Sequence, residues 1–178
     1  MTVEITGQII GFVAMALIIL SFQIKDPKKM ILVQSAAQLL FTVHYFMIGS
    51  PSGALQNAVS VIRAICLISS FKPLKSKAAK WVFIAAYMLM PIITMNSPTD
   101  FIPFLPGIGM AINTYCLWDM NSRRHRMSQL FIVSPLWIAY NIFNLSYAGI
   151  LTEVFNASSS LVFLLRTHAF SRNKGEQK

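Results

Sequence analysis

The chain has 178 residues, of which 55% are hydrophobic and only 12% are charged, and its mean hydropathy is +0.59. This composition lies far from that of soluble domains and indicates a membrane protein. The net charge is +9, but the basic residues form short clusters between apolar runs, without interleaved aromatic residues on one face. They therefore indicate orientation in a bilayer and no nucleic-acid partner.

Seven apolar runs approach or reach the length of about 20 residues that crosses a hydrocarbon core as a helix. The first run lacks the basic n-region of a cleaved signal peptide, because the first charge is Glu4, and it is expected to remain as a helix. The turn at residues 49–53 is rich in glycine, serine and proline and separates the second run from the third. The predicted helices span residues 5–23, 30–48, 54–71, 81–95, 101–119, 127–145 and 148–166.

Nearly all lysine and arginine residues fall in loops that would lie on the same side of the membrane. Fourteen of the 15 fall in the loop before residue 30, in the loop 72–80, in the loop 123–126 and in the tail from Arg166 onward, which seven crossings place on one side of the membrane. The positive-inside rule then predicts a periplasmic N-terminus and a cytoplasmic C-terminus. Only Arg63 remains inside a predicted helix.

The second half of the chain echoes the first. An offset of 97 residues pairs Met30 with Met127, and beyond the turn an offset of 96 pairs Gly53 with Gly149. We predict an all-α membrane protein of seven transmembrane helices, with two parallel three-helix repeats joined by a linker helix (3+1+3). The predicted organisation is a first repeat at 1–71, a basic loop and linker helix at 72–98, a second repeat at 99–167 and a basic cytoplasmic tail at 168–178.

Polar residues gather in the third and seventh predicted helices, where burial in lipid is costly. Residues at positions i, i+3 and i+7 share one face of a helix. In the seventh helix these are the polar residues Glu153, Asn156 and Ser160, and in the third they are the polar Asn57 and Ser60 with the small Ala64. We interpret four residues as candidates for binding a small polar solute, namely Asn57, Ser60, Glu153 and Asn156. Four more are candidates for gating or support, namely His44, Arg63, Asn141 and Ser160.

Structural interpretations of the same residues stay open. Polar side chains in membrane helices often only bond a neighbouring helix, each bond contributing about 0.6 kcal/mol. Glu153 and Arg63 lie about a turn and a half apart in depth, so an ion pair between them is an alternative to a solute site. His44 is as typical of a core histidine as of a ligand. Pro106 and Pro135 fit either a hinge or static kinks.

No catalytic residue, metal site or cofactor is predicted, and an enzyme is not expected. The sequence contains no G-x-S-x-G, H-E-x-x-H, P-loop or dinucleotide motif. Cys66 and Cys116 lie inside apolar runs without zinc or redox spacing. The expected partners are the lipid bilayer and a small polar solute. Gly7 and Gly11 form a small-residue face that fits either a homodimer or packing within the bundle.

Four segments carry a resemblance to a known family: HYFMIG at 44–49, NAVSVIR at 57–63, PLWIAYNIF at 135–143, and Gly149 through Glu153 to Arg166. On these segments the chain resembles the bacterial inner-membrane family Imp-YgjV over nearly its whole length. The resemblance implies a multi-pass inner-membrane protein and no particular biochemical activity.

In plan the chain is also similar to the SWEET and PQ-loop transporters. These share the 3+1+3 arrangement and place polar residues of helices three and seven around the substrate. The segment Ser21-Phe22-Gln23 lacks the proline of a PQ motif, so the likeness is architectural. We therefore predict a transporter or facilitator of a small polar metabolite that works by alternating access. The alternative is a non-transporting scaffold or regulatory protein of the inner membrane.

Overall fold

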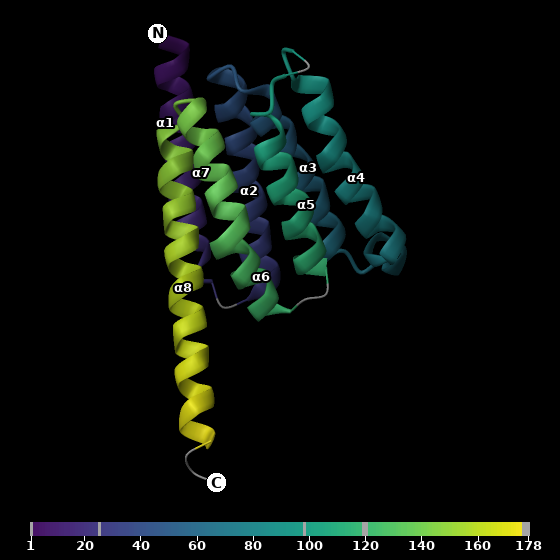
Figure 1. The fold of residues 1–178 in the computed structure, drawn as a ribbon, viewed down its shortest axis with the longest axis vertical. Helices are drawn as coiled ribbons and strands as arrows, with labels where there is room; N and C mark the ends of the chain where they lie inside the picture. Colours follow the sequence, from purple (N-terminus) through teal and green to yellow (C-terminus); the bar gives the residue numbers. More distant parts are fainter. Residues whose placement is uncertain (1, 25, 98, 119–120, 176–178) are drawn as a thin grey trace.

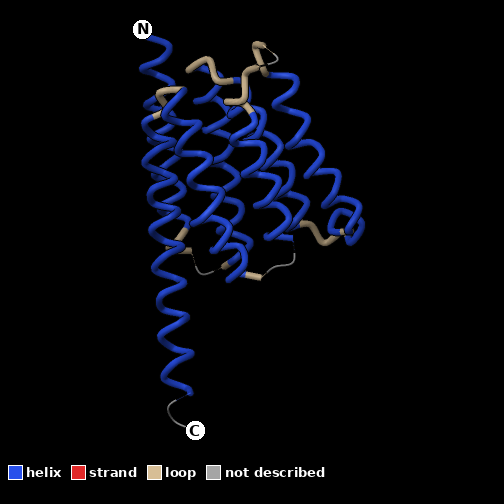
Figure 2. The backbone as a smooth tube through the Cα atoms, in the orientation of Figure 1, coloured by secondary structure: helices blue, strands red, loops and turns tan. Residues whose placement is uncertain are grey.

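The computed structural model describes residues 2–24, 26–97, 99–118 and 121–175, and every regular element in these residues is helical (Figures 1 and 2). The expectation of an all-α protein is confirmed. The elements are α1 (Thr2–Ser21), α2 (Pro27–Met47), α3 (Pro51–Ile68), the 3-10 turn η1 (Lys72–Lys75), α4 (Lys77–Thr94), α5 (Phe104–Trp118), α6 (Ser122–Ser128), the π-helical segment η2 (Gln129–Val133), α7 (Ser134–Phe143) and α8 (Tyr147–Gly175).

Each predicted helix has a counterpart; the first four begin three or four residues earlier than predicted and end one to three residues earlier, and the other three also differ from expectation. Among the described residues, α1, α2, α3, α4 and α8 are long and apolar enough to cross a membrane. The fifth predicted helix begins at Phe104 rather than residue 101, and its expected end at residue 119 lies outside the described residues. The sixth is divided into α6, η2 and α7. The seventh continues as α8 to Gly175, where a tail had been expected from residue 168.

Side-chain caps explain where several helices begin. The Asp26 carboxylate accepts hydrogen bonds from the backbone N–H groups of Lys28 and Lys29, and Pro27 occupies the first helical position of α2. Ser76 and Asn121 cap α4 and α6 in the same way. These short polar residues satisfy N–H groups that have no partner within the helix. The loops between apolar runs therefore set the helix starts locally.

The helices form two groups that face each other. In the first half of the bundle (α1 to α3), α2 lies between α1 and α3, and in the second half (α5 to α8), α7 lies between α5 and α8 (Figure 1). The halves meet where α1 contacts α8 and where α3 contacts α5. Helix α4 packs against α3 and α5 at the edge, and of its described side chains only Tyr87 and Pro91 are buried.

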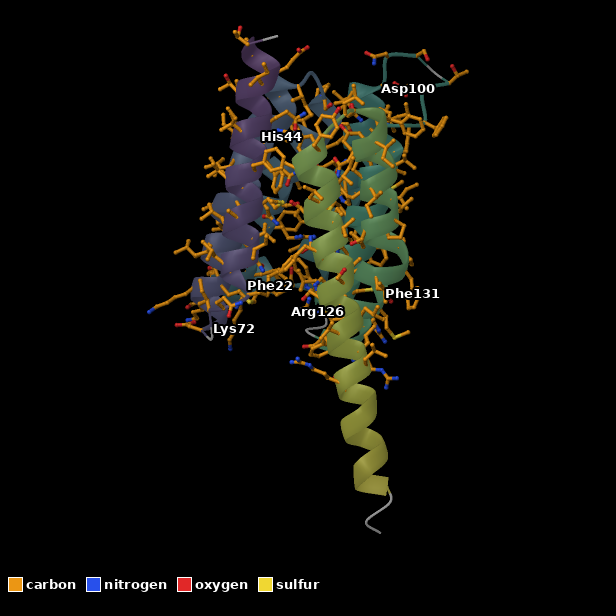
Figure 3. All side chains as sticks on the ribbon, turned by 90° about the vertical axis from the view of Figure 1, so that its left-hand side faces the viewer. Phe22, His44, Lys72, Asp100, Arg126 and Phe131 are labelled. Atoms are coloured by element: carbon orange, nitrogen blue, oxygen red, sulfur yellow. The ribbon has the colours of Figure 1, made fainter. Side chains whose placement is uncertain are left out.

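The two ends of the bundle differ in composition. We call the end with the turns 48–50 and 144–146 the turn end, and the end with the segments 22–26, 69–76 and 121–124 the basic-loop end. The N-terminus and Asp100 lie at the turn end, whereas Lys72 and Arg126 lie at the other (Figure 3). This placement agrees with the division of charge seen in the sequence.

The two turns at the turn end share one backbone geometry. Gly49 has a φ of 75°, and Leu145, 96 residues later, has a φ of 51°. Equivalent backbone bonds close them: Ser50 N–H to the Tyr45 carbonyl at 2.8 Å, and Ser146 N–H to the Asn141 carbonyl at 2.9 Å. Glycine adopts this left-handed conformation freely, but a leucine does so at a cost because its Cβ approaches the backbone.

Candidate solute cavity

A cavity of about 490 Å³ lies between the two halves of the bundle. It runs from Tyr45 and Trp137 toward the basic-loop end, where its lining includes the exposed residues Asn121 and Ser122. Its lining comes from both halves and combines apolar side chains with polar ones, among them Gln38, Asn57, Arg63, Asn113, Glu153 and Asn156. A space of this size matches the pockets that hold small molecules.

Glu153 presents a carboxylate to this cavity, and its donors are all neutral. Ser134 Oγ donates to Oε2 at 2.7 Å, Gln129 Nε2 donates to the same oxygen at 3.1 Å, and Asn156 Nδ2 donates to Oε1 at 3.3 Å. Neutral donors satisfy the oxygens but leave the negative charge of an ionised carboxylate without a counter-ion. Glu153 is therefore held in one orientation by neutral groups, without an ion pair among the described residues.

The π-helical segment brings two of these donors together. In an α-helix, residues five apart point in directions that differ by about 140°, so Gln129 and Ser134 would diverge. In η2 the Ser134 N–H donates to the Gln129 carbonyl, and Gln129 Nε2 donates to Ser134 Oγ at 2.9 Å. Pro135 follows directly and lacks the N–H that would continue a regular α-helix. The sequence had indicated a hinge or a kink here, and the structure has a widened turn.

Arg63 lies in the same cavity and does not pair with Glu153. Its Nη1 donates to Thr114 Oγ1 at 2.6 Å, and its Cζ lies 5.5 Å from the centre of the Tyr87 ring. The residue is 4% exposed, and its Nε is buried without a partner. The ion pair that the sequence left open is thus not formed.

At the turn end, hydrogen bonds join the two halves. His44 Nδ1 lies 2.7 Å from the Gly7 carbonyl, which can only accept, so Nδ1 carries the proton. In the neutral ring, His44 Nε2 then accepts from Ser146 Oγ at 2.7 Å, and Ser146 Oγ accepts from the Gly149 N–H at 3.2 Å. This chain of bonds connects α1, α2 and α8 and uses both nitrogens of the histidine.

Three aromatic rings cover the cavity at the same end. The rings of Tyr45, Trp137 and Tyr140 lie 5.7 to 6.1 Å apart. Tyr45 OH donates to Asn141 Oδ1 at 2.7 Å, and the Gly53 N–H donates to Tyr140 OH at 2.7 Å. Each bond crosses between the halves. The cavity is therefore closed toward the turn end by aromatic packing and by hydrogen bonds between the halves.

Residues 5–170 match the family Imp-YgjV, described as a bacterial inner membrane protein. The chain belongs to this family. No curated protein and no solved structure matches it. The predicted family is thereby confirmed, and together with the apolar helices it identifies a multi-pass protein of the bacterial inner membrane.

The structure of this Imp-YgjV protein separates the predicted binding residues. Asn57, Glu153 and Asn156 line the cavity. Ser60 does not, although it was expected to share a face with Asn57 and Ala64. Its hydroxyl bonds the Gln56 carbonyl at 2.8 Å and Tyr87 OH at 2.9 Å, so it lies on the side of α3 that packs against α4.

The predicted gating residues are also divided. Arg63 lines the cavity, whereas His44 and Asn141 are buried in the hydrogen bonds of the turn end. Ser160 is buried away from the cavity lining. Sequence reasoning missed Gln129 and Ser134, two of the three donors to Glu153. The signal for them was a pair of polar residues five apart in an apolar run just before Pro135.

The small-residue face of α1 is used inside the chain. A Cβ added at Gly11 would lie 2.8 Å from His44 Nδ1 and 2.9 Å from Ala148 Cβ, and one added at Gly7 would lie 3.0 Å from Met47 Cβ. Helices α2 and α8 therefore approach α1 at these glycines. Of the two alternatives for this face, the structure has packing within the bundle.

Proposed function

We propose that the protein is a carrier or facilitator that moves a small polar metabolite across the inner membrane by alternating access. One observation carries the proposal: a cavity shared by both halves contains a carboxylate and a guanidinium that do not neutralise each other. Charges in a membrane protein are costly and mark solute or ion pathways. In this mechanism the closed turn end and the cavity directed to the basic-loop end would belong to one of the two access states.

A correspondence between the contacts of the two halves supports this mechanism. Helices α1, α2 and α3 of the first half correspond in order to α5, α7 and α8 of the second. Under this correspondence, the contact between α1 and α8 is equivalent to the contact between α5 and α3. The left-handed residues Gly49 and Leu145 are equivalent at an offset of 96. We infer two parallel three-helix repeats with α4 as linker. In such a carrier, one repeat rocks against the other around a fixed site.

Closure at the basic-loop end requires groups that can meet there. Arg126 of α6 lies with its Cζ 5.3 Å from the centre of the Phe22 ring and 5.5 Å from that of Phe163. These contacts link α6 to Phe22, directly after α1, and to α8, and all three residues line the cavity. We propose that they tighten when the turn end opens. From the positive-inside rule we infer that this end faces the cytoplasm and the N-terminus the periplasm.

Transport by the purified protein tests the proposal. Uptake and counterflow are measured in proteoliposomes with sugars, nucleosides, vitamins, amines and amino acids, with and without a pH gradient. Glu153→Gln keeps the shape of the side chain and removes its charge, and Ser60→Ala is the control because Ser60 lies outside the cavity lining. We expect a transported solute whose flux is lost in folded Glu153→Gln and kept in Ser60→Ala. Absence of flux across the panel, with all proteins folded, contradicts the proposal.

The scaffold alternative has its own support in the turn end. There His44, Tyr45 and Tyr140 are engaged in bonds between helices, as expected of residues that only hold a bundle together. A scaffold predicts that Glu153→Gln and Asn57→Ala lower thermal stability in detergent, while any cellular phenotype follows protein level. A carrier predicts loss of the phenotype at unchanged protein level.

A further inference from the structure

Arg63 brings a positive charge into the bundle without a counter-ion among the described residues. A guanidinium stays protonated even when buried, and this one is 4% exposed. The chain has six acidic residues. Of those the structure describes, which are Glu4, Asp26, Asp100 and Glu153, only Glu153 lines the cavity, and its oxygens are engaged by neutral donors.

The contacts of Arg63 offset only part of the cost of its burial. The hydroxyl of Thr114 occupies one nitrogen, and the face of the Tyr87 ring attracts the charge. Its Nε has no partner, although the side chain lines a cavity large enough for a small molecule. A buried charge without a partner of opposite charge is strongly unfavourable, and such a partner offsets part of that cost. A bound anion is such a partner.

Two side-chain amides that line the cavity also have a buried atom without a hydrogen-bond partner. Asn113, next to Thr114 on α5, and Gln38 on α2 each have a buried side-chain oxygen without a hydrogen bond, and both line the cavity. Rotation of a side-chain amide by about 180° exchanges its oxygen and its NH2 group. Asn113 and Gln38 can therefore each direct an NH2 group toward an anion. An arginine and two amides without full partners thus face one space.

The charges of the lining select among anions. Arg63 brings one positive charge that no acidic side chain among the described residues pairs with, and a monoanion neutralises it. A dianion such as a phosphate monoester would bring a second negative charge into a cavity that the carboxyl group of Glu153 also lines. The planar guanidinium also matches a carboxylate, which it can bind with two parallel hydrogen bonds.

We propose that Arg63, supported by Asn113 and Gln38, is the subsite for a carboxylate group, so that the solute is a small monocarboxylic acid. Glu153 then faces the rest of the molecule, where it accepts from hydroxyl or ammonium groups. Transport of this acid rests on the carrier function proposed above, but binding of a carboxylate at Arg63 does not.

Acetate, the smallest stable probe with the required group, tests the subsite directly. The full chain is labelled with 15N-arginine in detergent micelles, and the Nε–H resonance of Arg63 is assigned by its loss in Arg63→Lys. We expect acetate to shift this resonance saturably and acetamide, its neutral counterpart, to leave it in place. Equal shifts with both, or no saturable shift with acetate, overturn the proposal.

Two variants separate the subsite from general charge effects. Asn113→Ala removes a donor and is expected to weaken acetate binding about tenfold, as loss of one hydrogen bond to a charged group does. Asn96→Ala, outside the cavity lining, is the control with unchanged affinity. Unchanged acetate affinity in folded Asn113→Ala contradicts the composition of the subsite.

Flux measurements distinguish failure of the subsite from failure of the carrier function. Acetate that binds at Arg63 while no acid crosses the proteoliposome membrane keeps the subsite and rejects the carrier. Flux of a neutral solute that is unaffected by acetate and by Arg63→Lys keeps the carrier and rejects the subsite. Flux of a monocarboxylic acid that falls at least about tenfold in Arg63→Lys supports both, because lysine cannot reproduce the two-pronged contact.

Discussion

The turn end and the cavity contain the same kinds of polar side chain and use them in opposite ways. At the turn end, both nitrogens of His44 have partners, and the Tyr140 hydroxyl accepts from the Gly53 N–H. Asn141 Nδ2 there is buried without a partner, but Asn141 does not line the cavity. In the cavity, Arg63 Nε and Asn113 Oδ1 have no partner either, and both side chains face a space large enough for a small molecule. The comparison teaches that a polar residue in a membrane helix is informative about function when it lines a cavity and the protein itself leaves part of its bonding capacity unused. Predictions that separate the two regions follow from this difference.

Gly53→Val should give the largest effect, because it forces a side chain into the closed turn end. A Cβ at this position would lie 2.9 Å from ring atoms of Tyr45 and 3.0 Å from the Tyr140 ring. We expect a loss of about 3 kcal/mol in the free energy of unfolding, measured by tryptophan fluorescence in mixed micelles. Gly49→Asn is the control, since nothing lies within 4 Å of that Cβ and asparagine tolerates its positive φ. Equal stability of the two variants would contradict the close packing.

Tyr140→Phe should remove one bond between the halves and leave a donor of α3 without a partner. The Gly53 N–H lies in the first turn of α3, where no carbonyl of the same helix is available. We expect a loss of about 2 kcal/mol in the free energy of unfolding. The matched control is Tyr147→Phe, because Tyr147 is 57% exposed. If both variants unfold at the same denaturant concentration, the hydroxyl of Tyr140 does not stabilise the turn end.

Asn57→Ala and Ser60→Ala contrast the two uses of polar residues on one helix. Asn57 lines the cavity, whereas Ser60 bonds Tyr87 of α4. We expect Asn57→Ala to lower solute uptake about tenfold, the effect of losing a hydrogen bond to the solute, with stability nearly unchanged. Ser60→Ala should keep uptake and lower the free energy of unfolding by about 0.6 kcal/mol. The reverse pattern would place the solute on the α4 side of α3.

Leu145→Gly should have the smallest effect and the opposite sign. The left-handed backbone costs a leucine about 1–2 kcal/mol, and glycine removes that cost. Glycine also makes the unfolded chain more flexible, which lowers the free energy of unfolding by about 0.5–1 kcal/mol. We expect a net stabilisation of about 0.5 kcal/mol, measured by the same unfolding assay. Gly49→Leu, at the equivalent position, should destabilise instead. A destabilised Leu145→Gly would show that the leucine side chain contributes more than its backbone costs.

Much of the fold was predictable because the formation of a membrane helix depends on the apolar length and the turn residues of a short segment of the chain. Apolar stretches, the proline at 27 and the glycine turn at 49 marked the helices to within a few residues. The π-helical segment was not predictable from the same signals, since its sequence QLFIV is as apolar as its neighbours. Its widened turn matters because it directs Gln129 and Ser134 toward Glu153 on another helix.

The candidate site was predicted in part. The sequence pointed to Asn57, Glu153 and Asn156 through their cost in lipid, and these residues do share a cavity. It also grouped Ser60 with them, because helical spacing alone places i and i+3 on one broad face. The rotation of α3 about its axis decides which residues of this face point to the cavity and which point to α4. Asn57 points to the cavity, and Ser60 points to α4.

The sequence by itself determined the membrane class, the family and the positions of the helices, because apolar length and turn residues act within a few residues of chain. Only the tertiary structure decided that Arg63 binds Thr114 rather than Glu153, that His44 is fully engaged at the turn end, and that the glycine face of α1 is buried. Each of these depends on which helix stands next to which, and at what rotation. Packing over the whole bundle sets those quantities, and no local pattern records them.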